Sequence, residues 1–338
     1  MENVYRVDRK CRFLFGMMAV TLIVAAAIPA FAESKSTAEA PTQMVVTVVD
    51  HGHDPTQKSS IQQSIVKIKE DGKPAQVLDW KSVTAPENTQ LVILIDDALQ
   101  ARSSANFTQL QKFILQLPAT TQVAVGYMQY GRASIVSGFA ANREMAAKSI
   151  RVPTGIAGVN ASPYFCLSDL AKHWPDQGRQ AAVRQVLMIT DGVDRYFSAG
   201  AYDPEDPYVG TAIKDTQANR IIVSSIYFRD IGAVDRGIRG SFVGGSYLTQ
   251  VAEATGGKMY NEGFGNPVTF VPLLADFSQR LADTYVVTFL AHGSGLQYIK
   301  ISSEEHGIKL EAPNEVTVGQ QLPKGSQITA GPRASESL

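Results

Sequence analysis

The chain has 338 residues, of which 44% are hydrophobic and 19% charged, and its formal net charge is -1. This balance is typical of a globular protein with one or two domains and a sizeable buried core. It excludes the strongly basic surface that binds nucleic acid, and no acidic block of the kind found in charged tails is present. Charge alone therefore does not identify a partner.

The first 32 residues have the three parts of a secretory signal peptide. A basic start is followed by the apolar run FLFGMMAVTLIVAAAIPA, which leads into Ala30-Phe31-Ala32, with a small residue at the first and third positions of a cleavage site. We expect cleavage after residue 32 and export of the mature protein, to the periplasm or to the outside. Uncleaved, the same run would be a membrane anchor, because it is about long enough to span a bilayer.

The rest of the chain is taken in order. Residues 33–41 are small and polar, which predicts a linker. Residues 42–90 alternate like strands around an Asp71-Gly72 turn, which indicates a small β segment. Residues 91–282 alternate between apolar strands and amphipathic helices, and residues 283–312 return to strands. Residues 313–338 are rich in Gly, Ser, Pro and Gln, and are predicted to be disordered.

The alternation in residues 91–282 predicts an α/β domain with a mostly parallel, doubly wound sheet covered by helices on both faces. We expect strands at 91–95, 122–127, 134–139, 185–189, 221–228 and 258–260. We expect helices at 107–117, 143–150, 164–173, 211–218, 247–255 and 270–281. The fifth helix should end at Gly256-Gly257.

Two of these strands end in acids. Asp96 and Asp97 follow LVILI, and Asp191 follows VLMIT. In an open parallel sheet, ligands bind outside the carboxyl ends of the strands, so we expect Asp96 and Asp191 to converge. Ser162, before a predicted helix, would add a hydroxyl. Two carboxylates and a hydroxyl are hard oxygen ligands that suit Mg²⁺ or Mn²⁺.

This combination resembles the metal-ion-dependent adhesion site of von Willebrand factor A domains. That site takes Asp-x-Ser-x-Ser from the first strand end, a Thr from a later loop and an Asp from the fourth strand. The resemblance covers residues 91 to about 281, and VLMITDGVD is its most specific part. The flanking sequences resemble a bacterial exported family of such proteins, many known from acidobacteria. The resemblance implies a small β element built from both flanks, and binding of a partner's acidic group through the metal.

The sequence departs from that pattern at two positions. Ala98 and Gln100 stand in place of the two serines, and neither side chain is an equivalent ligand. We therefore predict a degenerate site of Asp96, Ser162 and Asp191, in which binding of Mg²⁺ or Mn²⁺ is weakened or lost. Two acids without a cation repel, which raises at least one pKa unless water, Arg102 or Arg195 intervenes. The plain alternative is that these acids only cap helices and turns.

The long loop FSAGAYDPEDPYVG at 197–210 follows the second acidic strand end. Long loops on a rigid scaffold often bind partners, and the alternative is a surface loop stiffened by proline. The basic, Gly-rich segment 229–247 is expected to be a second loop at the same edge of the sheet. The predicted partner surface consists of Asp97, Tyr202, Asp203, Asp206 and Tyr208.

Together these features indicate an exported adhesion or interaction module that recognises an unidentified protein at the carboxyl edge of the sheet. We expect that the protein is not an enzyme, because its sequence contains none of four common catalytic or binding motifs: Gly-x-Ser-x-Gly, Walker, Cys-x-x-Cys and His-Glu-x-x-His. Two alternatives remain open. One is a Mg²⁺-dependent hydrolase that uses Asp96 and Asp97, and the other is an envelope scaffold whose flanking strands pair with another chain.

Overall fold

The computed structural model describes residues 39–50, 62–83, 88–100, 104–139, 142–156, 158–176, 181–196, 206–229, 237–263 and 266–323. The predicted signal peptide and residues 33–38 of the predicted linker lie outside this set, as do Arg102, Tyr202 and Asp203. Within it, no helix is both long enough and apolar enough to cross a membrane.

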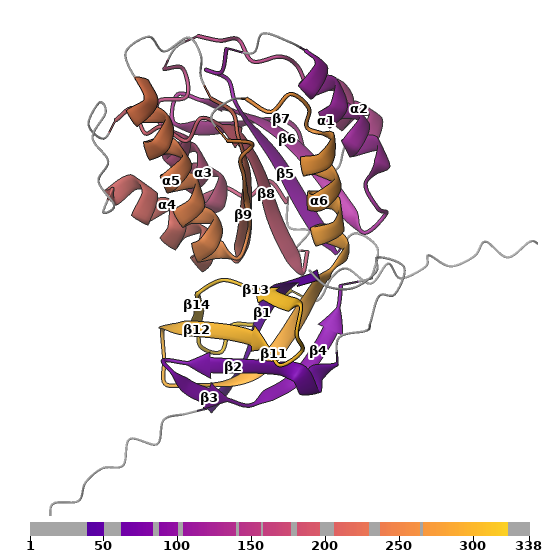
Figure 1. Ribbon diagram of the computed structural model, residues 1–338, viewed down its shortest axis with the longest axis vertical. Helices are drawn as coiled ribbons and strands as arrows, with labels where there is room; N and C mark the ends of the chain where they lie inside the picture. The colour runs from indigo at the N-terminus through magenta and orange to yellow at the C-terminus, as the bar shows by residue number, and fades with distance from the viewer. Residues whose placement is uncertain are drawn as a thin grey trace, which may run out of the picture. The chain divides into compact units, whose positions relative to one another are not determined.

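A six-stranded sheet carries the two acidic strand ends (Figure 1). Its strand order is β10-β9-β8-β5-β6-β7, and all neighbours are parallel except the β6–β7 hairpin. If the strands of this sheet are numbered 1 to 6 along the chain, from β5 to β10, the order read from β7 to β10 is 3-2-1-4-5-6. This is the order of a doubly wound sheet. The strands are β5 (Thr89–Asp96), β6 (Thr121–Gln129), β7 (Arg132–Ser137), β8 (Val183–Thr190), β9 (Ile221–Tyr227) and β10 (Met259–Tyr260). The predicted fold class, an α/β fold with a doubly wound and mostly parallel sheet, is confirmed.

Helices cover both faces of this sheet (Figure 1). Leu91, Ile93 and Ile95 of β5 pack in one core with α1 (Ala105–Gln116), α2 (Arg143–Lys148) and α6 (Val271–Ala282). Val92 and Leu94 point to the other face, where they pack with α3 (Pro163–Lys172), α4 (Pro207–Ala218) and α5 (Gly237–Thr255). Because both faces are buried, β5 and β8 are apolar along nearly their whole length rather than alternating.

The largest departure from the expected helices is α5. It begins at Gly237, ten residues before the expected start, so 237–247 is helical and the predicted basic loop there is wrong. Glycine has low helix propensity, which is why the segment was predicted as a loop. Packing overrides the propensity: a Cβ built on Gly244 would lie 2.0 Å from the carbonyl oxygen of Asp191. Only glycine permits this approach of α5 to the end of β8.

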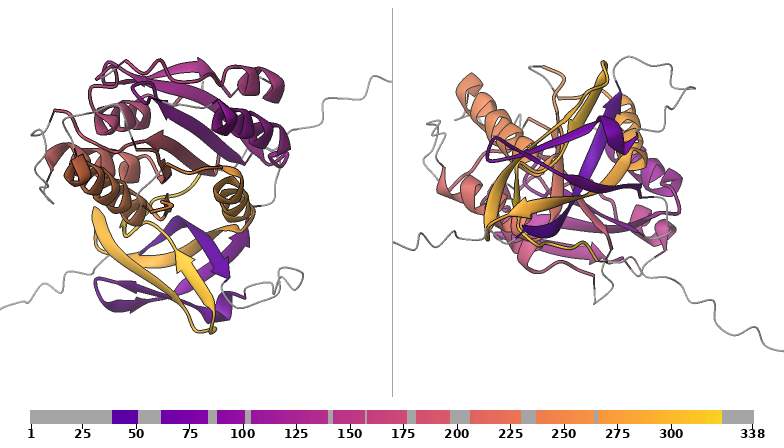
Figure 2. Two further views of the ribbon diagram at one scale, coloured as in Figure 1. Left: turned by 45° about the horizontal axis from the view of Figure 1, so that its top comes forward. Right: turned by 90° about the horizontal axis from the view of Figure 1, so that it is seen from below.

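The two flanks form a pair of four-stranded sheets, ordered β13-β1-β11-β4 and β14-β12-β2-β3, with a shared apolar core that includes Val46, Ile68, Val287 and Ile299 (Figure 2). Strands from before and after the α/β domain pair with one another, β1 with β11 and β2 with β12, which confirms the small β element. Its elements are β1 (Glu39–Asp50), a 3-10 turn (Gln63–Ile65), β2 (Val66–Glu70), β3 (Lys73–Ala75), β4 (Val77–Ser82), β11 (Thr284–His292), β12 (Leu296–Ser303), β13 (Ile308–Glu311) and β14 (Glu315–Thr317).

Two of the predicted boundaries change. Residues 39–41, predicted as linker, already belong to β1. The predicted disorder from residue 313 does not hold for 313–323, because β14 pairs with β12 and the Leu322 N–H donates to the side chain of Gln43. Residues 324–338 lie outside the described residues.

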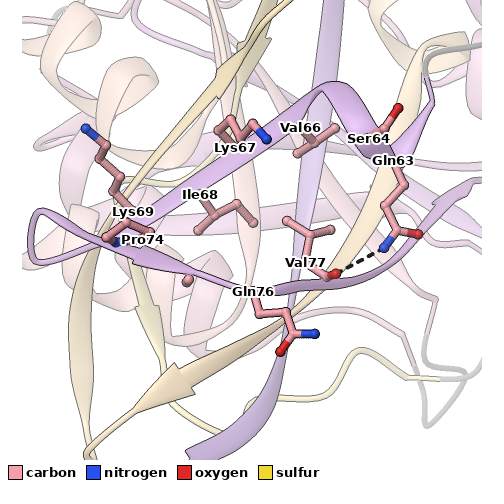
Figure 3. A pocket seen from close by; sticks show the side chains of 10 residues that line it. Gln63, Ser64, Val66, Lys67, Ile68, Lys69, Pro74, Gln76 and Val77 are labelled. Carbon is pink, nitrogen blue, oxygen red and sulfur yellow. Dashed lines mark hydrogen bonds between the residues drawn. The ribbon is translucent and has the colours of Figure 1, made fainter.

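A hollow of about 700 Å³ lies between β2 and the β3–β4 segment (Figure 3). Ile68 and Val77 contribute apolar side chains to it, and Lys67 and Lys69 contribute amines. At one end the Gln63 amide donates to the carbonyl oxygen of Val77 at 3.0 Å. No carboxylate is among its lining residues, so its chemistry differs from that of the acidic strand ends.

Candidate functional site

Asp96, the last residue of β5, is completely buried among hydrogen-bond donors. One carboxylate oxygen accepts from the backbone N–H of Ala98 at 2.9 Å. The other accepts from the side-chain amide of Asn160 and from the hydroxyl of Thr190, both at 2.8 Å. Thr190 ends β8, so the parallel pairing of β5 with β8 brings this hydroxyl to Asp96. Both oxygens of the carboxylate therefore already have protein donors.

Asp191, at the end of the neighbouring strand, is 3% exposed. Its carboxylate accepts from Nη2 of Arg195 at 2.8 Å and from the backbone N–H of Val193 at 3.0 Å. Nη1 of Arg195 also donates to the side-chain oxygen of Asn160 at 3.3 Å. Asn160 therefore links Asp96 to the Arg195–Asp191 ion pair. The structure brings the two acids to one carboxyl edge, and Arg195, one of the two arginines considered from the sequence, provides the positive charge.

The environment of Asp96 favours its protonated form. Burial raises the pKa of Asp96, and the negative charge of Asp191 raises it further, against smaller effects of Arg195 and of the Ala98 and Thr190 hydrogen bonds. The result is a pKa of about 7 in place of 3.8. The repulsion expected between two facing acids is therefore the second cause, after burial, and it persists although Arg195 is present.

We expect the free energy of unfolding to fall as the pH rises from about 4 to about 7, because folded Asp96 keeps its proton in this range and unfolded Asp96 does not. Asp96→Asn has no proton to lose, so its unfolding free energy should lack this part of the slope. Urea denaturation at closely spaced pH values measures both proteins. A variant with the wild-type slope between pH 4 and pH 7 would show that Asp96 does not titrate there.

Ser162 does not face Asp96. It is completely buried and caps the N-terminus of α3, where its hydroxyl accepts from the Tyr164 N–H at 3.2 Å. The same hydroxyl donates to the carboxylate of Asp194 at 2.8 Å. Asp194 is 4% exposed and was not singled out from the sequence, although it lies three residues after Asp191 in the same motif.

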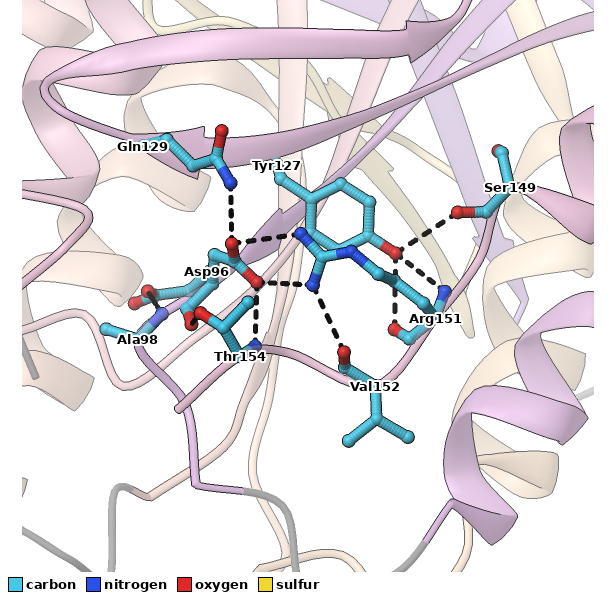
Figure 4. A network of polar contacts seen from close by, with 9 residues as sticks. Asp96, Ala98, Tyr127, Gln129, Ser149, Arg151, Val152 and Thr154 are labelled. Atoms are coloured by element: carbon cyan, nitrogen blue, oxygen red, sulfur yellow. Dashed lines mark hydrogen bonds and ion pairs between the residues drawn. The ribbon is translucent and has the colours of Figure 1, made fainter. Parts of the chain in front are cut away.

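Asp97 is not on the surface, contrary to its predicted place in a partner surface. It is buried and accepts from both terminal nitrogens of Arg151, at 2.6 and 2.9 Å, from the Gln129 amide at 2.6 Å and from the Thr154 N–H at 2.9 Å. Figure 4 labels these three donors, Arg151, Gln129 and Thr154. Burial opposes ionisation of Asp97, but the hydrogen bonds from Arg151, Thr154 and Gln129 outweigh it and hold the pKa below its ordinary value. Asp97 therefore fastens segment 151–154 to the end of β5.

Two of the predicted partner-surface residues, Asp206 and Tyr208, make contacts within the fold. Asp206 is 2% exposed and caps α4, accepting from the N–H groups of Tyr208 at 2.8 Å and Val209 at 3.3 Å. Burial raises the pKa of Asp206. Tyr208 is half-buried with its ring against Phe165, at 4.6 Å between centroids. The remaining predicted surface residues, Tyr202 and Asp203, lie outside the described residues.

These contacts test whether the residues fit a divalent ion. Mg²⁺ or Mn²⁺ needs several oxygen atoms that point at one position. Here Asp96 faces N–H and O–H donors, Asp191 faces a guanidinium, and the Ser162 hydroxyl is bound to Asp194. No group of three or more His, Cys, Asp or Glu side chains in the described part of the chain is arranged to hold a metal. The residues present do not fit the ion.

Comparison with known proteins adds the following. No family model and no curated protein matches the chain. An aerotolerance-related membrane protein from Bacteroides fragilis is 13% identical, with 57% of this chain and 98% of that chain covered and a TM-score of 0.38. The VWA domain of SpRpn10 is 10% identical, with coverage of 56% and 94% and a TM-score of 0.36. Human COPII-coat protein Sec24c is 10% identical, with coverage of 70% and 44% and a TM-score of 0.37. The likeness is low, so the fold assignment depends on the strand order and helix placement described above.

Proposed function

We propose that this chain is an exported adhesion or interaction module that recognises a protein partner through the carboxyl edge of its central sheet, without a divalent cation. Asp96, Asp97 and Asp191 at this edge are buried, so a partner there would meet other groups. Tyr130 is 80% exposed, Tyr196 is 65% exposed and Ile156 is 61% exposed. The high exposure of the Tyr130 side chain is the main observation that supports the proposal.

Tyr130 occupies a backbone conformation that bulky residues avoid. It lies in the turn between β6 and β7 with φ of 52°, followed by Gly131 with φ of 74°. Asn, Asp and Gly are the residues that such tight hairpin turns favour. The N–H of Tyr130 donates to the carbonyl oxygen of Val159 at 2.5 Å, which ties the turn to the loop before Ser162. A strained aromatic that is largely in solvent has little packing to offset the strain, which favours a binding role.

Tyr130 belongs to a group of aromatic residues that we call the aromatic platform, formed by Tyr130, Phe165, Tyr196 and Tyr208. Phe165 stacks edge-on with Tyr196 at 5.0 Å and with Tyr208 at 4.6 Å. Gly131 brings the turn against Phe165, since a Cβ on it would lie 3.7 Å from the Phe165 Cβ. Tyrosines are enriched among the residues that contribute most to binding at protein interfaces.

A hollow of about 540 Å³ adjoins the platform. Its lining includes Tyr130, the exposed Arg132 and His173, and Asp169, whose carboxylate accepts from the Ala133 N–H at 3.0 Å. A partner side chain placed there would contact the Tyr130 ring and the Arg132 guanidinium. The partner surface that we propose is therefore the aromatic platform with this hollow, in place of the acidic rim expected from the sequence.

Tyr130→Asn separates a binding role from a structural one. Asparagine tolerates the left-handed turn, so we expect the unfolding free energy to stay equal or to rise by about 1 kcal/mol. Loss of the ring should weaken partner binding by roughly 30-fold, the effect of a strong interface residue. The partner is captured by photocrosslinking in intact envelopes from a reactive side chain at position 196, and its affinity is then measured with and without EDTA.

Tyr298→Asn is the matched control, because Tyr298 is 51% exposed on β12 and lies outside the platform. It should bind the partner like the wild type. Undiminished binding by Tyr130→Asn would contradict recognition through the platform. A loss of wild-type binding in EDTA would contradict metal independence alone.

The hydrolase alternative needs Asp96 and Asp97 to act together. Their carboxylates have separate donors: Asp97 is held by Arg151, Gln129 and Thr154, none of which bonds Asp96. Neither this alternative nor the envelope scaffold is favoured by an observation on the described residues. Phosphoesterase activity that disappears in Asp96→Asn would reverse this preference.

A further inference from the structure

We infer that the guanidinium of Arg195 is the resident cation of the Asp96–Asp191 site and that it excludes divalent metal ions. The inference depends on the metal-independent part of the proposed function, and it does not depend on the existence of a partner. It assigns to one side chain of this chain the charge that a metal supplies in an adhesion site.

The first step is the need for a positive charge. Asp96 is 0% exposed and Asp191 is 3% exposed, and both lie at the carboxyl ends of adjacent strands. Two acids withdrawn from water at one place cannot both ionise without a compensating cation, unless the protein gives up much of its stability. Arg195 meets this need from within, because its side chain is 9% exposed and its Nη2 lies 2.8 Å from the Asp191 carboxylate.

The second step is that the local geometry of the chain after β8 places Arg195 beside Asp191. It follows Asp191 by four residues, and Gly192 between them has φ of 68°, a conformation that turns the chain sharply after β8. Nη1 of Arg195 also lies 3.4 Å from the carbonyl oxygen of Val193. One short segment thus supplies both the acid and its cation.

The third step is the orientation of Asn160. Its side-chain oxygen lies 3.3 Å from Arg195, and its side-chain nitrogen lies 2.8 Å from the Asp96 carboxylate. A guanidinium only donates, so Arg195 requires the Asn160 oxygen on its own side, and this leaves the Asn160 NH₂ group to face Asp96. With Arg195 in place, Asn160 therefore presents a donor where a metal would need an oxygen ligand.

The fourth step is what removal of Arg195 would leave. Asp96, Asp191, the Thr190 hydroxyl and a freely turning Asn160 amide would provide four oxygen-bearing groups without a cation. Such a set is suited to Mn²⁺ or Mg²⁺. Loss of the arginine should therefore convert a closed site into a weak divalent-ion site.

The experiment compares melting temperatures of the mature protein with and without millimolar MnCl₂. The wild type should not respond. Arg195→Met, which keeps the length of the side chain and removes its charge, should melt lower and should regain several degrees with Mn²⁺. Arg195→Met combined with Asp191→Asn should melt higher than Arg195→Met without Mn²⁺ and should not respond to the ion. Titration calorimetry with Mn²⁺ should give heat only for Arg195→Met.

Arg184→Met is the matched control. Arg184 is also buried and pairs with a single acid, Asp176, at 2.7 Å. This variant should melt lower and should not respond to Mn²⁺, because one acid alone makes no divalent site.

Three results would overturn the inference. The first is a wild type that gains as much from Mn²⁺ as Arg195→Met does. The second is an Arg195→Met protein that melts like the wild type and ignores Mn²⁺. The third concerns the case in which Arg195→Met does not fold. The inference then expects Arg195→Met combined with Asp191→Asn to fold. If this double variant also fails to fold, the arginine is needed for packing and not for its charge. None of these measurements involves a partner, so they leave the result for Tyr130→Asn unaffected.

Discussion

Gly244→Ala is expected to lower the free energy of unfolding by about 3 kcal/mol or more, whereas Gly245→Ala is expected to raise it by up to about 1 kcal/mol. A Cβ on Gly244 would lie 2.0 Å from the carbonyl oxygen of Asp191, which is backbone and cannot move aside cheaply. A Cβ on Gly245 meets nothing within 4 Å, so that substitution only improves helix propensity. Chemical denaturation of both variants and the wild type measures the difference.

The neighbouring position serves as the control, since both variants place the same residue in the same helix. Equal stabilities for the two variants would contradict the close contact between α5 and the end of β8. Because the contacted carbonyl belongs to Asp191, we also expect Gly244→Ala to displace the Arg195–Asp191 ion pair. Gly244 is therefore part of what positions the site.

Asp97→Ala is the second large effect, with an expected loss of about 3 kcal/mol. The substitution leaves the Gln129 amide and the Thr154 N–H without the acceptor that they have at 2.6 and 2.9 Å. Arg151 is 43% exposed and regains water, which limits its share of the loss. Lys258→Ala, which breaks a pair with Asp276 where both side chains are more than 40% exposed, is the control and should change stability by less than 1 kcal/mol.

The same variant should change the response to acid. The pKa of Asp97 is held below its ordinary value, so its contribution to stability is present at neutral pH and is lost as the pH falls below about 4. Asp97→Ala should therefore lose less stability than the wild type on acidification. This sign is opposite to that of Asp96, whose contribution changes between pH 4 and pH 7. If Asp97→Ala and the wild type lost the same unfolding free energy on acidification, the lowered pKa of Asp97 would be contradicted.

Much of the fold could be predicted because local chemistry and tertiary packing agree. The apolar runs that became β5 and β8 are buried on both faces, and the helices between them carry the expected apolar stripes. α4 begins at Pro207, four residues before the predicted helix start. Asp206 is its N-cap and Pro207 lies in its first turn, so this proline starts a helix and does not belong to a loop. The predicted helix at 247–255 is shorter than α5 because glycine-rich sequence before Tyr247 favours a loop by propensity.

The candidate site could also be predicted only in part. The convergence of Asp96 and Asp191 followed from a rule about parallel sheets, which needs only the order of strands and helices. The partners of the acids did not follow, since Arg151 is 54 residues from Asp97 and Asn160 is 35 residues from Arg195. Nothing in the local sequence indicates such pairs.

The sequence by itself determined the doubly wound class of the sheet and the edge at which Asp96 and Asp191 gather, because hydrophobic periodicity and the alternation of strands with helices are visible in short segments. Only the tertiary structure decided that Asp96 and Asp191 are buried, that Arg195 pairs with Asp191 and contacts Asn160, and that Tyr130 and Tyr196 are exposed. Those outcomes depend on which distant donors reach a carboxylate once the chain has folded, and on where the backbone comes too close for any side chain but hydrogen.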